Sequence, residues 1–86
     1  MNNPMDTPKV ESFVIPTIDI EATGSNLRKL FKAHGYSVSD IQDLLCIGSN
    51  QAIYSWLNGR NLPALENIVA LSHLLGVAIE ELIILE

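Results

Sequence analysis

Residues 37–60, which read SVSDIQDLLCIGSNQAIYSWLNGR, give the clearest indication of the fold. Ser37 opens a capping-box pattern, which predicts the start of a short helix. Further along, Gly48 can adopt the positive φ that a sharp turn requires. Ser49 or Asn50 can then cap another helix. The stretch therefore predicts two short helices that are joined by one tight turn.

The second of these helices, expected over residues 49–58, has two chemically different faces. Ile53, Trp56 and Leu57 follow helical spacing and are predicted to face inward. The outward positions carry neutral polar side chains, namely Asn50, Gln51, Tyr54, Ser55 and Asn58. Asn and Gln side chains can bond N6 and N7 of adenine in the major groove. The two helices are therefore typical of a helix-turn-helix whose second helix reads bases.

Apolar residues outside this unit also recur with the period of a helix. Further helices are expected from Thr23 to Gly35, from Pro63 to Gly76, and over residues 79–83. The sequence thus predicts an all-α bundle of five helices, which forms a single domain over residues 23–86.

Residues 1–22 are expected to form an N-terminal arm, flexible at first and extended over residues 13–20. The segment from Phe13 to Ile20 is rich in β-branched residues, and Pro16 excludes a central strand. An extended segment or a short edge strand fits it. Residues 13–20 and 82–85 have more consecutive apolar positions than one helical stripe needs. We predict that they form a homodimer interface. The alternative is that the arm folds over its own bundle.

In their order and spacing, these motifs resemble the phage-repressor (Xre/Cro) family over residues 23–83. The resemblance rests on Thr23-Gly24, Gly35-x-Ser37, Ile53-x-x-Trp56, Gly59-Arg60-x-Leu62-Pro63, and Leu74-Leu75-Gly76-Val77 followed by Glu80-Glu81-Leu82. It implies a lambda-repressor-like DNA-binding bundle. It also implies roles for matching positions: Asn50, Gln51 and Ser55 would read bases, and Asn58 and Arg60 would contact the DNA backbone.

Tyr54 and Ser49 are added to these base-reading and backbone-contacting sets because of their places on the expected helix. Tyr54 lies on the same outward face and is added to the base-reading set, although a surface position without a role fits it equally well. Ser49 stands at the helix N-terminus, which favours a phosphate, and is added to the backbone set.

The sequence departs from the family at three places. Val38 stands where a Gln usually holds a phosphate. Gln42 stands where a small Ala usually lets the two helices approach, and the turn is one residue longer, so an altered packing angle is expected. Phe31 and Leu57 stand where many members pair Arg with Glu, and we expect them to pack together instead.

The chain has 86 residues and a net charge of −5, but its cations are concentrated in the middle. Residues 23–61 carry a net charge of +2, which fits one face that meets phosphate. The single cysteine, Cys46, is expected to be a buried thiol. No ligand cluster, nucleophile–base set, signal peptide or membrane-spanning run is present. We therefore expect a cytoplasmic protein that is not an enzyme, has no metal or cofactor, and has no small-molecule domain.

The sequence accordingly predicts a regulator of transcription, a repressor, that binds specific double-stranded DNA as a homodimer. A second reading remains open. The acidic net charge, and the absence of Lys or Arg from the reading helix before Arg60, also fit a protein-binding helix-turn-helix module. Such a module, for example an antitoxin or a polymerase-associated factor, would have little affinity for DNA.

Overall fold

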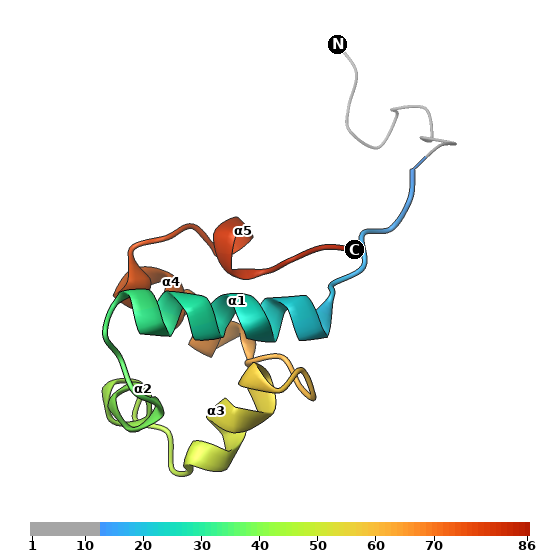
Figure 1. The fold of residues 1–86 in the computed structure, drawn as a ribbon. Helices are drawn as coiled ribbons and strands as arrows, with labels where there is room; N and C mark the ends of the chain where they lie inside the picture. Colours follow the sequence, from blue (N-terminus) through green and yellow to red (C-terminus); the bar gives the residue numbers. More distant parts are fainter. Residues whose placement is uncertain (1–12) are drawn as a thin grey trace.

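Five helices account for most of residues 13–86, the part of the chain that this computed structural model describes. In chain order they are α1 (Ile20–Ala33), α2 (Val38–Leu44), α3 (Asn50–Leu57), α4 (Leu65–Leu75) and α5 (Ile79–Leu82). Helix α1 runs through the middle of the bundle, with α2 and α3 on one side and α5 on the other (Figure 1). The predicted all-α bundle of five helices is confirmed. The flexible start of the predicted arm, residues 1–12, lies outside the described residues.

The first three helices begin where a side chain can accept a backbone N–H. Helix α1 begins at Ile20 rather than at Thr23, because the carboxylate of Asp19 accepts the amide of Ala22 at 2.9 Å. Helix α2 begins as predicted, with the capping box of Ser37 complete. Helix α3 is capped by Ser49, whose hydroxyl accepts the amide of Gln51 at 3.1 Å.

Helix α4 begins two residues later than predicted. Pro63 does not open it, because Ala64 is still extended, with a ψ of 154°, and the first helical residue is Leu65. The carbonyl of Ala64 accepts the first backbone bonds, from Asn67 at 2.9 Å and from Ile68 at 3.0 Å. Pro63 itself is buried, so the proline belongs to the packed connector between α3 and α4.

The extended segment before α1 pairs with the C-terminal segment of the same chain. The amide of Asp19 donates to the carbonyl of Ile84 at 2.8 Å, and the amide of Glu86 donates to the carbonyl of Thr17 at 2.9 Å. These bonds flank a single antiparallel bridge between Ile18 and Leu85. The predicted edge strand is therefore reduced to one bridged pair, because α1 already begins at Ile20.

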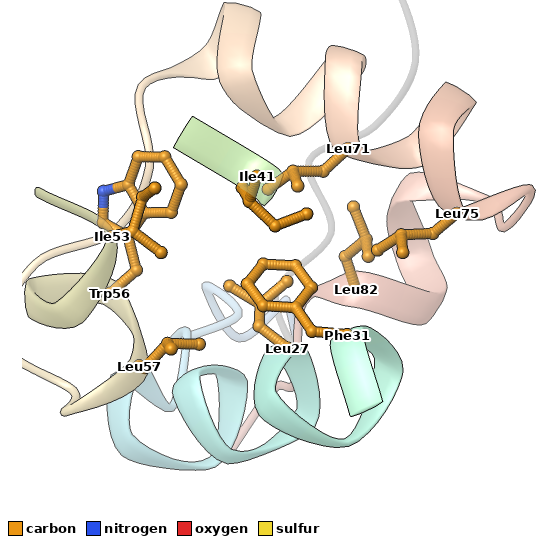
Figure 2. Close-up of a cluster of buried hydrophobic side chains, with 9 residues drawn as sticks. All are labelled: Leu27, Phe31, Ile41, Ile53, Trp56, Leu57, Leu71, Leu75 and Leu82. Carbon is orange, nitrogen blue, oxygen red and sulfur yellow. The ribbon is translucent and has the colours of Figure 1, made fainter. Parts of the chain in front are cut away.

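The core draws side chains from all five helices (Figure 2). Its members are Leu27, Phe31, Ile41, Ile53, Trp56, Leu57, Leu71, Leu75 and Leu82. Ile41, Ile53 and Leu71 are completely buried. Trp56 is a core residue, and Phe31 and Leu57 belong to the same buried cluster, as the loss of the family's ion pair at their positions suggested. The three inward residues predicted for α3 are thus confirmed.

A close contact between α1 and α3 fixes how these two helices cross. A Cβ atom built on Gly24 would lie against the carbonyl oxygens of Trp56 and Leu57, at 2.8 Å from that of Leu57. Both neighbours are backbone atoms at the end of α3, and they cannot rotate away as a side chain could. Only glycine therefore allows α1 to come this near to α3.

None of the helices within residues 13–86 has the length and the apolar character that crossing a bilayer would need.

We predict that Gly24→Ala lowers the free energy of unfolding by about 1–3 kcal/mol, the usual cost of forcing an atom into a packed contact. Gly48→Ala is the matched control, because a Cβ at Gly48 meets no atom within 4 Å. The control should change stability by less than about 1 kcal/mol. Denaturant unfolding of the two variants measures both values, and equal effects would contradict the close contact.

Candidate nucleic-acid interface

The turn between α2 and α3, residues 45–49, depends on one left-handed residue. Cys46 has a φ of 54°. Its amide donates to the carbonyl of Asp43 at 3.3 Å, and the amide of Ile47 donates to the carbonyl of Gln42 at 2.9 Å. This pair of bonds is the Schellman arrangement that closes a helix C-terminus, with the left-handed residue just beyond the last turn.

Two expectations about this turn are wrong. The sequence predicts a positive φ at Gly48, but Cys46 adopts it, because the helix closes immediately after Leu45. The sequence also predicts a buried Cys46, but the side chain is exposed. A residue in the left-handed conformation no longer continues the apolar stripe of the helix that precedes it.

Gln42, which was expected to alter the packing of the two helices, is half-buried.

Helix α3 separates its two faces as predicted. Ile53, Trp56 and Leu57 are buried. Asn50, Gln51 and Tyr54 are exposed, and 44% of the tyrosine surface is accessible. No residue of α3 carries a formal charge. The exposed face therefore offers amide and hydroxyl groups that can both donate and accept hydrogen bonds.

A polar hollow of about 440 Å³ gathers most of the predicted site residues. It is lined by Gln51, Tyr54, Ser55, Asn58, Arg60 and Asn61. Ser49 and Asn50, at the N-terminal end of α3, do not line it. The structure thus brings five of the seven predicted residues to one hollow, and it adds Asn61, which the sequence reading missed.

Ser55 connects α3 to the loop that follows it. Its hydroxyl accepts Nδ2 of Asn61 at 2.6 Å, and its carbonyl accepts the amides of Arg60 at 2.9 Å and of Asn61 at 3.4 Å. Ser55 is half-buried, in contrast to its exposed neighbour Tyr54. This serine therefore holds the loop with Arg60 and Asn61 beside the exposed face of α3. The sequence shows only that an amide side chain, Asn61, follows Arg60, and this does not predict its bond to Ser55.

Asn58 links the end of α3 to α1. It is the C-cap residue of α3, and its Oδ1 accepts Nη2 of Arg28 at 3.2 Å. Arg28 is exposed and lies on α1, thirty positions away in the sequence. The sequence counts Arg28 among the cations of residues 23–61, but it predicts no contact to Asn58, since nothing in the spacing of these two residues points to one.

The comparisons with known proteins agree with this geometry. A helix-turn-helix family model matches residues 27–82, which include all of α2, the turn and α3. The chain belongs to the helix-turn-helix family. The resemblance to the phage-repressor type, drawn from the sequence motifs, is confirmed. None of the curated protein sequences matches the chain.

Two solved structures share the fold of this helix-turn-helix protein. One is the restriction-modification controller protein C.AhdI from Aeromonas hydrophila, which is 26% identical. The match covers 74% of this chain and 96% of C.AhdI, with a TM-score of 0.66. The other is the DNA-binding domain of BldD, which is 18% identical. That match covers 77% of this chain and 94% of the BldD domain, with a TM-score of 0.64. Both likenesses support the lambda-repressor-like arrangement of the five helices.

The exposure of Cys46 leads to a direct prediction. In the folded protein the thiol should react with a chromogenic disulfide reagent nearly as fast as it does in denaturant, because Cys46 is exposed. Stopped-flow labelling with and without denaturant measures the two rates. Strong protection in the folded state would show that the turn is closed differently.

Proposed function

We propose that this protein binds specific double-stranded DNA and regulates transcription, with α3 placed in the major groove. The proposal is carried by the two faces of α3. Ile53, Trp56 and Leu57 hold the helix on the bundle, and its uncharged polar side chains face outward. A helix with these faces, after a short helix and a tight turn, fits the geometry by which helix-turn-helix proteins read base edges. A binding role without catalysis is part of the proposal.

Base reading is assigned to Asn50, Gln51, Tyr54 and Ser55. Gln51 is the strongest member, because it is exposed and lies in the first turn of α3, where a side chain can reach adenine N6 and N7. The hydroxyl of Ser55 already accepts a bond from Asn61, so its part is to donate to a base while it holds the loop.

Contacts to the DNA backbone are assigned to Ser49, Asn58 and Arg60. Ser49 is the N-cap of α3, and Asn58 and Arg60 lie just beyond the other end of the helix. Phosphate contacts at both ends of a reading helix would fix its register on the duplex, while the residues between them read the sequence.

We further propose that the protein acts as a repressor. A bound bundle of this size can exclude other proteins from the stretch of DNA that it covers. C.AhdI, with 26% identity, is described as a controller protein, which supports a regulatory role for this chain as well.

A homodimer through residues 13–20 and 82–85 completes the proposal. The bridge between Ile18 and Leu85 brings the two segments together, and Pro16 and Ile18 line one hollow with Ile83 and Leu85. Phe13, Val14 and Ile15 are 67%, 81% and 77% exposed. Two identical chains can bury such a surface by packing it against its copy in a twofold contact. The two subunits would then read two half-sites.

Selection of bound sequences from random duplex DNA tests the reading helix. Wild-type protein should enrich a defined half-site, and Gln51→Ala should lose the preference at one base pair, which is worth about 1–3 kcal/mol. The control is His73→Ala, an exposed polar residue of α4 outside the hollow. It should return the wild-type half-site.

The wild-type protein and its selected duplex also distinguish DNA binding from the protein-binding alternative. Affinity for the selected duplex should fall steeply as salt rises, because phosphate contacts release counterions. If the wild-type protein bound no duplex even at low salt, the DNA proposal would be wrong. The acidic charge would then favour a protein partner.

Sedimentation equilibrium tests the dimer. Val14→Asp should weaken self-association, because it places a charge in the proposed interface at a site that is 81% exposed. Leu65→Asp is the matched control, since Leu65 is 73% exposed but lies on α4. A wild-type protein that stays monomeric at high concentration would refute the interface.

A further inference from the structure

Two cations of α1 lie together beside the proposed DNA surface. Arg28 and Lys32 are one helical turn apart, both are exposed, and both line a hollow of about 260 Å³. The other walls of the hollow come from Phe31 of α1, from Tyr36, Ser37 and Val38 at the entry to α2, and from Leu57 of α3. The hollow therefore lies where the first three helices meet.

The hydrogen bond from Arg28 to Asn58 directs the guanidinium group of Arg28 toward the C-terminal end of α3. Nη2 of Arg28 donates to Oδ1 of Asn58 at 3.2 Å, and Asn58 caps the end of the proposed reading helix. A guanidinium group has five N–H donors in a planar fork, and this bond uses one of them. The fork is thereby held at the end of α3, where its other donors can meet the oxygens of a phosphate.

The surroundings of the hollow favour an anion. Its floor includes Phe31 and Leu57, which are 3% and 6% exposed, so one side of a bound charge would face an apolar surface instead of water. Charge attraction is stronger beside such a surface than in bulk water. The residues that line the hollow include no carboxylate, and the carboxylate of Asp40 accepts the amide of Ser37 at 2.8 Å in the α2 cap.

We propose that Arg28 and Lys32 together hold one phosphate of the DNA backbone in this hollow. The inference rests on the proposed DNA-binding function and deepens it. Val38 offers no side-chain donor at the start of α2, and Phe31 and Leu57 carry no charge. The cations of α1 supply a phosphate contact at the same junction.

The test is the salt dependence of affinity for one duplex, chosen by selection with the wild-type protein. Neutralising both side chains, in Arg28→Gln/Lys32→Gln, should reduce the slope of log affinity against log salt by about 0.9, the value for one lost phosphate contact. Affinity should fall by a similar factor on unrelated duplexes, since a phosphate carries no sequence information.

Lys29→Gln is the matched control. Lys29 is an exposed cation of the same helix, but it does not line the hollow. It should leave the salt slope unchanged. Thermal unfolding of each variant should match the wild type, because all three side chains are exposed.

The outcomes distinguish this inference from the function on which it rests. If the wild-type protein binds DNA, and Gln51→Ala changes its sequence preference, but the double variant keeps the wild-type slope, the phosphate site is refuted alone. If Lys29→Gln lowers the slope by half as much as the double variant or more, the effect is one of general charge and the site is refuted as well. A wild-type protein without salt-dependent DNA binding would overturn both proposals.

Discussion

The close approach of α1 to the end of α3 determines how the helices of this bundle pack. Gly24 lets the backbone of α1 meet the last carbonyl groups of α3. Buried residues of the two helices, Leu27 and Phe31 on one side and Trp56 and Leu57 on the other, then close the core around this crossing. The direction of the exposed face of α3 follows from that crossing, because a helix that is fixed at one end and along one face has little freedom left.

The opposite side of α1 is held by polar contacts to the C-terminal segment. The hydroxyl of Thr23, which is 1% exposed, accepts the amide of Ile84 at 3.0 Å. Nδ2 of Asn26 donates to the carbonyls of Glu81 at 2.7 Å and Leu82 at 3.1 Å. Helix α1 therefore connects the two surfaces to which we assign functions. One side supports α3, the proposed reading helix, and the other supports the apolar surface around Ile18 and Leu85.

Much of this arrangement could be predicted because it depends on local chemistry. The caps at Ser37 and Ser49 each act within three residues of their own position. The inward stripe of α3 follows from helical spacing alone. The same local rules gave a wrong prediction in the turn after α2, where the glycine at position 48 and the end of the helix indicated different left-handed residues. Gly48 was the obvious turn residue, but the position of the last turn of α2 decided that Cys46 would be left-handed.

The remaining contacts could not be predicted, because they join residues that the sequence keeps far apart. Arg28 and Asn58 are separated by 30 positions, and Thr23 and Ile84 by 61. The motif Thr23-Gly24 is one of the features that resemble the family. Its structural role is visible only in the folded chain, where the hydroxyl of Thr23 is buried and Gly24 contacts the backbone of α3. The surface near Arg28 was missed for the same reason, since its partners come from three different helices.

The assignment of α3 as the DNA-reading surface can be tested by following backbone amide resonances during titration with a selected duplex. We predict that the largest shift changes fall in residues 49–61 and near Arg28, while α4 changes little. Changes confined to α4 and α5, or none at all, would contradict it.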